Sequence, residues 1–183
     1  MKKISTLYKK NPNDLSRVIN EVNPENNWVF TDEGVKATRK FDGTACAIIN
    51  GLLYKRYDVK KGKTVPEGAI PCQEPDPITG HWPHWVHCEI SNPGDKYHLE
   101  AYHAYFDDGT YELVGPKVQD NPEKFDKHTL IRHGWVNLDI DFKNYTFDMF
   151  KNYLQYTPIE GIVFHHSDGR MCKLRKSDYG FKR

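Results

Sequence analysis

Lys40-Phe41-Asp42-Gly43 is the segment of this sequence whose residue types could do covalent chemistry. A lysine ammonium has no lone pair, but burial beside other cations favours the neutral amine, which attacks electrophiles. Asp42 could orient this amine or help to hold a metal ion, and Gly43 would let the backbone approach a ligand closely. The segment therefore offers a candidate nucleophile, although Lys-x-Asp-Gly also occurs where a surface strand ends in a turn.

Charged residues in three later segments could complete a site around such a lysine. Glu112 and Glu160 each interrupt or precede an apolar, β-branched run, and carboxylates of this kind are oxygen ligands for Mg²⁺. Lys173 and Arg175 are two residues apart, so in an extended segment they share one face. Two cations on one face suit a phosphate, which an arginine binds bidentately. The set fits attack on an α-phosphate with loss of pyrophosphate.

The order of these segments resembles the covalent nucleotidyltransferases, which include ATP-dependent RNA ligases, ATP-dependent DNA ligases and mRNA-capping guanylyltransferases. The matching segments run from about Lys36 to Asp178. The individual matches, from the first motif to the fifth, are Lys40 to Asp42, Lys55-Arg56-Tyr57-Asp58, Tyr111-Glu112-Leu113, Glu160-Gly161-Ile162-Val163 and Lys173-Leu174-Arg175. Residues 115–122 and 128–134 also resemble a phage and bacterial subgroup of small RNA-ligase-like proteins. The second motif is a looser match, and the fifth has Arg175 where the family usually has lysine.

The resemblance implies a role for each matched residue. Lys40 would be the nucleophile that becomes nucleotidylated, supported by Asp42. The nucleotide would contact Arg56, Glu112, Glu160, Lys173 and Arg175, and a metal ion, Mg²⁺ or Mn²⁺, would contact Asp42, Glu112 and Glu160. Lys173 and Arg175 would also hold the α-phosphate and neutralise the charge that develops on it.

The reaction that the resemblance implies is ATP-dependent RNA ligation, as in RNA repair. Lys40 would take AMP from ATP, pass it to a 5′-phosphate end, and a 3′-hydroxyl would then displace it. The sequence ends about ten residues after Lys173, which leaves no room for a C-terminal oligonucleotide-binding domain and favours RNA ends over DNA ends. Two alternatives stay open: a GTP-dependent capping-type guanylyltransferase, and a non-catalytic module that binds nucleotide or RNA.

The length favours a single domain over residues 1–183, with an insert at about 62–96. The resemblance implies that this domain has an α+β nucleotidyltransferase fold, with antiparallel sheets enclosing a nucleotide cleft. With a net charge of +1, the protein as a whole does not attract nucleic acid electrostatically. Nucleic acid would have to bind a local basic patch, and the candidates are Lys55, Arg56, Lys60, Lys61 and Lys63. A solvated hairpin explains these charges equally well. Four cysteines without a disulfide-framework spacing, and no membrane-spanning or signal-peptide pattern, favour a cytoplasmic protein.

The pattern of residues predicts the following elements. We expect helices over 14–19 and 148–156, strands over 28–30, 34–40, 44–49, 52–57 and 111–114, a hairpin turn at Asn50-Gly51, either strand or helix over 97–106, and strands at the fourth and fifth motifs separated by a turn at 167–169.

Residues 62–96 are rich in proline and glycine and predict a long ordered loop or insert without regular structure. This insert and the residues after it contain Cys72, His81, His84, His87, Cys88, His98 and His103. Thiolates and imidazoles are zinc ligands, but no Cys-x₂-Cys pair is present and prolines interrupt the run. We therefore do not expect a structural zinc ion here, and local hydrogen bonding explains the histidines better.

Overall fold

The computed structural model describes residues 3–77 and 79–182, and these form two compact units. Residues 42–133 form one unit, which we call the central unit. Residues 3–41 and 134–182 form the other, which we call the terminal unit because it contains both ends of the described chain. Each unit has its own hydrophobic core.

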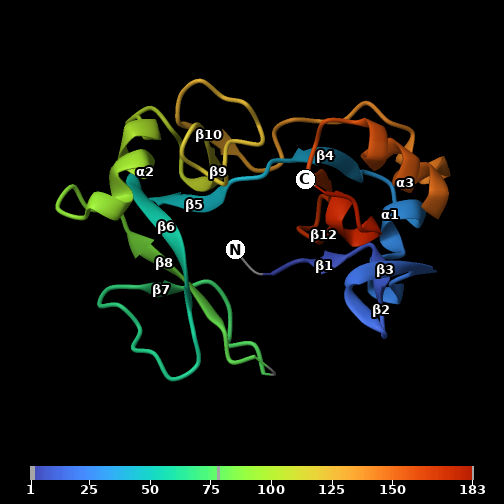
Figure 1. Cartoon of the computed structure of the whole chain (residues 1–183), viewed down its shortest axis with the longest axis horizontal. Coiled ribbons are helices and arrows are strands. Elements are labelled where there is room, and N and C mark those ends of the chain that lie inside the picture. Colours follow the sequence, from blue (N-terminus) through green and yellow to red (C-terminus); the bar gives the residue numbers. More distant parts are fainter. Residues whose placement is uncertain (1–2, 78, 183) are drawn as a thin grey trace. The chain divides into compact units, whose positions relative to one another are not determined.

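The central unit is built on a six-stranded antiparallel sheet in the order β10-β9-β5-β6-β8-β7 (Figure 1). Its strands are β5 (Thr44–Ile49), β6 (Leu52–Val59), β7 (Ile70–Pro71), β8 (Trp82–His87), β9 (Gly109–Val114) and β10 (Thr129–Arg132). The short helices η2 (Pro93–Asp95) and α2 (Lys96–Ala101) follow β8. The core residues Ile48, Leu53, Tyr111 and Leu113 come from three neighbouring strands of this sheet.

The hairpin between β5 and β6 confirms the predicted turn. Asn50 and Gly51 have φ angles of 52° and 71°, the left-handed values that a two-residue hairpin turn requires at both positions. Asn and Gly adopt these angles at low cost, so the sequence alone identifies the turn. The carboxylate of Asp108 accepts hydrogen bonds from the backbone N–H groups of both residues.

The terminal unit contains a four-stranded sheet in the order β1-β12-β11-β4 and a two-stranded sheet of β2 and β3. The strands are β1 (Ser5–Thr6), β2 (Tyr8–Asn11), β3 (Asp14–Val22), β4 (Lys36–Lys40), β11 (Gly161–His165) and β12 (Met171–Arg175). The helices are η1 (Pro24–Asn26), α1 (Trp28–Thr31), η3 (Phe142–Asn144), α3 (Phe147–Tyr156) and η4 (Lys176–Tyr179). The β1–β12 pair is parallel, and the other pairs among the described strands are antiparallel.

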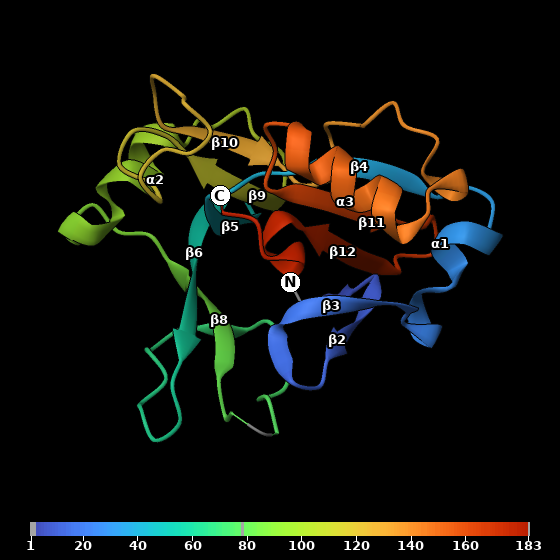
Figure 2. The ribbon, with the colours of Figure 1, turned by 45° about the vertical axis from the view of Figure 1, so that its right-hand side comes forward.

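One face of the four-stranded sheet packs on α3, which lies across it in Figure 2. Phe150 and Leu154 of α3 are fully buried against Phe164 of β11 and Leu174 of β12. Because side chains alternate along a strand, this buried face leaves the opposite face of the same strands for polar side chains. The core of the terminal unit therefore determines which residues of β4, β11 and β12 are available for chemistry.

Two expected elements of the terminal unit are wrong. Residues 14–19, expected as a helix, lie in β3, where Val18 is buried and Leu15 is 71 % exposed. The pairing of β3 with the preceding strand β2 decides this conformation, and residues 14–19 taken alone do not reveal it. Residues 28–30, expected as a strand, lie in helix α1, because three apolar residues carry too little periodicity to separate the two.

The predicted insert at 62–96 is more regular than expected. Its residues include β7, β8 and η2, and β8 pairs with β6 along its whole length. Pro83 favoured the reading as a loop, but proline is tolerated near the start of a strand, and Pro83 is the second residue of β8. The segment 97–106, for which strand and helix were left open, begins within α2. The remaining expected strands, the turn at 167–169 and the helix at 148–156 are confirmed within a few residues.

The fold class is mixed α+β, with mostly antiparallel sheets and few helices, as the sequence predicts. Among the described residues, no helix combines the length and the apolar character that crossing a membrane would require.

Gly43 directly precedes β5, and because it has no side chain the backbone can pass close to β9. A Cβ at this position would lie 2.1 Å from the backbone oxygen of Leu113, a contact that neither backbone can relieve without moving. We expect Gly43→Ala to lower the free energy of unfolding by roughly 1–3 kcal/mol, because overpacking separates the two strands. Denaturant unfolding measures this. The control is Gly94→Ala, whose Cβ would meet only the exposed side chain of Asn92, and an equal loss in both variants would contradict the account.

Candidate functional site

The register of β4, β11 and β12 places the residues of three sequence motifs in one row. Gly161 of β11 lies directly opposite Lys40 of β4 on one side and Arg175 of β12 on the other. In the next row on the same face, Val163 lies between Thr38 and Lys173. The two rows place Lys40, Lys173 and Arg175 on one face of the sheet, separated by a glycine that has no side chain.

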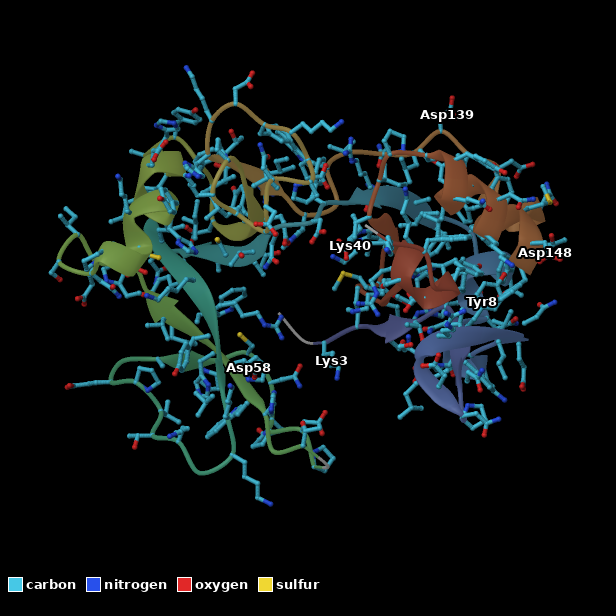
Figure 3. The ribbon with its side chains drawn as sticks, viewed as in Figure 1. Lys3, Tyr8, Lys40, Asp58, Asp139 and Asp148 are labelled. Carbon is cyan, nitrogen blue, oxygen red and sulfur yellow. The ribbon has the colours of Figure 1, made fainter. Side chains whose placement is uncertain are left out.

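Lys40 is the last residue of β4, and its position there can be seen in Figure 3. Its Nζ lies 2.5 Å from Oε2 of Glu160, the residue that precedes β11. The Glu160 side chain is only 8 % exposed and that of Lys40 is 24 % exposed. The candidate nucleophile is thus held by a mostly buried carboxylate but is still open to a ligand from solvent.

Lys173 is the most perturbed cation of this face. Burial and, to a smaller extent, the positive charges of Arg175 and Lys40 together lower its pKa to about 8. Asp178 and Glu160 act in the opposite direction but do not compensate. No carboxylate among the described residues forms an ion pair with Lys173. A buried lysine among other cations has the environment of an anion site, because a bound phosphate would relieve both the repulsion and the loss of solvation.

Arg175 is fixed by a buried carboxylate. Asp178 is 0 % exposed, and its two oxygens accept hydrogen bonds from the Arg175 backbone N–H, from its Nε at 3.3 Å and from its Nη2 at 2.9 Å. Lys10 of β2 donates to the same carboxylate at 2.7 Å. Although burial alone would raise the pKa of Asp178, the hydrogen bonds from Arg175 and Lys10 hold it below its usual range. The carboxylate therefore orients two cations at once.

The charges named here do not balance. Lys10, Lys40, Lys173 and Arg175 contribute four positive charges, and Glu160 and Asp178 contribute two negative ones, so the set carries a net charge of 4 − 2 = +2 when all are ionised. Phosphate groups are the natural ligands of such an excess, and a guanidinium held in place by a carboxylate retains N–H donors for them. The face can therefore hold an anion next to a nucleophilic amine.

In the central unit, Glu112 of β9 has a histidine partner. His133 Nε2 lies 2.8 Å from Oε2 of Glu112, and His133 Nδ1 lies 3.0 Å from the hydroxyl of Thr110. Glu112 is 9 % exposed. A buried carboxylate that is bonded to a histidine can also accept a hydrogen bond from a hydroxyl group of a ligand. It could bind a metal ion instead if the imidazole gave up its hydrogen bond to the carboxylate.

The other predicted residues of the central unit have different environments. Asp42 is 6 % exposed, and its backbone N–H donates to Glu123 at 2.8 Å. Arg56 lies on β6 opposite Trp85 of β8 and is partly exposed. Lys55, assigned to a basic patch, forms an ion pair with the buried Asp95. The patch is therefore reduced to Arg56 and the exposed Lys60, Lys61 and Lys63.

Lys40, Glu160, Lys173 and Arg175 thus come together in the terminal unit, and Asp42, Arg56 and Glu112 belong to the central unit. Sequence reasoning missed Lys10, Asp178 and His133 as partners of these residues. Lys10 and Asp178 are 168 positions apart, and no local pattern links them. His133 lies in the segment 128–134 that contributed to the resemblance, but only the pairing of β10 with β9 brings it near Glu112.

No protein-family model matches the chain, and no curated protein matches it at the required significance.

The lowered pKa of Lys173 makes a prediction about stability. In the folded protein the amine loses its proton near pH 8, whereas in the unfolded chain it does so near 10.5. The folded state therefore binds fewer protons between these values, and its stability rises with pH across them. We expect Lys173→Met to raise the free energy of unfolding at pH 7 and to lose this advantage by about pH 10.5.

Urea unfolding at several pH values measures this effect. The matched control is Lys36→Met in β4, whose lysine is exposed. A difference between Lys173→Met and wild type that does not change with pH would contradict the assignment.

Asp178 makes a second prediction. We expect Asp178→Asn to lower the free energy of unfolding by roughly 2–3 kcal/mol at neutral pH, because Arg175 and Lys10 lose their shared charged acceptor. Since the pKa of Asp178 is lowered by folding, its contribution is complete above the usual aspartate value of 3.8 and is lost as the pH falls through the folded value. Thermal unfolding against pH tests this. Asp168→Asn, at an exposed ion pair, should have a far smaller effect.

Proposed function

We propose that this protein is an ATP-dependent RNA ligase that begins its reaction by transferring AMP to Lys40. The observation that carries the proposal is the row formed by Lys40, Gly161 and Arg175, with Lys173 beside it. The row supplies a nucleophilic amine and positive charges that can bind an anion. The glycine between them has no side chain to block a ligand. The order of the sequence motifs supports the same proposal, and so do the antiparallel sheets, which are compatible with a nucleotidyltransferase fold.

The first step needs an amine next to an α-phosphate. A bond forms between Lys40 Nζ and the phosphorus as the bond to the pyrophosphate oxygen breaks. The nitrogen, an ammonium at the start, releases two protons and keeps one in the phosphoramidate. Glu160 Oε2, 2.5 Å from Nζ, is placed to orient the amine and to accept a proton from it. The excess positive charge from Lys173 and Arg175 would stabilise the negative charge that develops on the phosphate oxygens.

Two further steps complete ligation. The AMP passes from Lys40 to a 5′-phosphate end, and a 3′-hydroxyl then attacks that phosphate and releases AMP. The family resemblance implies that Arg56 and Glu112 contact the nucleotide, and that Asp42, Glu112 and Glu160 contact Mg²⁺. As hard oxygen donors, these carboxylates fit Mg²⁺, which would add positive charge to that of the side chains. The assignments stay predictions, and so does the preference for RNA ends.

Labelling with nucleotide tests the proposal. Purified protein is incubated with Mg²⁺ and ATP or GTP labelled at the α-phosphate, and the covalent product is measured after denaturation. We expect label from ATP in the wild type, none in Lys40→Ala, and wild-type labelling in Lys36→Ala, an exposed lysine of the same strand. The control separates loss of the nucleophile from loss of one positive charge on β4.

Each other outcome would replace the proposal with a stated alternative. Label from GTP alone would indicate a capping-type guanylyltransferase. Bound ATP without any covalent label would indicate a module that binds nucleotide but does not react with it. If the wild type is labelled, a 5′-phosphorylated RNA strand and its DNA equivalent then test which end accepts the AMP.

A further inference from the structure

A second cluster of reactive side chains lies in the central unit, among residues that the proposed reaction does not use. Cys88 directly follows β8, Asp95 ends η2, and His98 lies on α2. One ligand atom from each of the three, the thiol sulfur, a carboxylate oxygen and an imidazole nitrogen, lies within 4.8 Å of the other two. Cys88 is 4 % exposed and Asp95 is 0 % exposed.

His98 is incompletely satisfied by its surroundings. Both ring nitrogens are shielded from solvent, and neither has a hydrogen-bond partner among the residues that the structure describes. A shielded imidazole without partners is costly, because its donor and acceptor lose water and gain nothing in return. The two ring nitrogens could therefore bind a partner from solution, which the described residues do not supply.

We propose that Cys88, Asp95 and His98 bind a zinc-type dication. A thiolate, an imidazole and a carboxylate together suit Zn²⁺, whereas Mg²⁺ and Ca²⁺ prefer oxygen ligands alone. Ligands at about 2.0–2.3 Å from zinc lie about 3–4 Å from one another, so the ligand atoms need to approach by at most about 1–2 Å. Three protein ligands leave the fourth tetrahedral position to water.

Binding is balanced in charge and protons. The thiol of Cys88 releases its proton to solvent as the sulfur–zinc bond forms, and the dication is then compensated by the thiolate and the Asp95 carboxylate. The backbone N–H of Glu89 donates to Asp95 Oδ2 at 3.1 Å and fixes the carboxylate from outside. The site would tie the end of β8 to α2 across a loop that has little regular structure of its own.

Lys55 is the competing explanation for this cluster. Its ammonium forms an ion pair with Oδ1 of Asp95. This ion pair satisfies the carboxylate but leaves both nitrogens of His98 without a partner. A carboxylate has lone pairs for both a lysine and a metal ion, so the two can coexist. The ammonium would, however, weaken metal binding by charge repulsion, which makes Lys55 a sensitive control.

Zinc titration of the metal-free full-length protein tests the site, with a chromogenic chelator as competitor. We expect one Zn²⁺ per chain, proton release on binding, and thiolate-to-cobalt charge-transfer absorption when Co²⁺ replaces Zn²⁺. Cys88→Ser and His98→Gln should each weaken zinc binding by more than about 100-fold, since each removes a direct ligand. Cys72→Ser and His87→Gln, the same substitutions outside the cluster, should bind like the wild type.

The expected result for Lys55→Gln is tighter zinc binding, because the repelling ammonium is gone. The inference is overturned if the wild type binds no zinc, if His98→Gln binds as well as the wild type, or if Lys55→Gln gains no affinity. The inference is independent of the proposed ligase reaction, because the titration measures bound metal and needs no nucleotide.

Discussion

Antiparallel register in the terminal unit is the constraint on which the candidate site depends. Three segments distant in sequence meet at Gly161, with Lys40 on one side and Arg175 on the other. Because alternate side chains point to opposite faces, the burial of Ile162 and Leu174 against the core commits the lysine and arginine to the other face. A slip of one residue in any of these strands would bury the charges and expose the core.

The cationic face also shows how a protein keeps like charges together. Glu160 holds Lys40, and Asp178 holds Arg175 and Lys10, each through ion pairs that the fold buries on the carboxylate side. Among the residues that the structure describes, Lys173 has no carboxylate in an ion pair with it, and its lowered pKa reflects that position. Without a bound anion, this cluster of positive charges lowers the stability of the folded protein. Clusters that lower stability in this way are often functional sites, which is a reason to assign this one a function.

Much of the local structure could be predicted, and the limits have physical causes. Asn50-Gly51 identifies its hairpin because only a few residues accept the required φ angles. The helix expected at 14–19 is a strand because pairing with β2, not local preference, decides its conformation. The charged motif residues could be named from their order, but the bond from Lys10 to Asp178 and the grouping of Cys88 with Asp95 and His98 depend on folding.

The measurement that tests the central claim most directly is peptide mapping by mass spectrometry after incubation of the protein with ATP and Mg²⁺. The account predicts an added adenylyl group on the peptide that contains Lys40, with the fragment ions placing it on that side chain. Lys36 and Lys173, on the same sheet, should stay unmodified. An adenylyl group on either of these lysines, or an unmodified protein that still binds ATP, would contradict the assignment of Lys40 as the nucleophile.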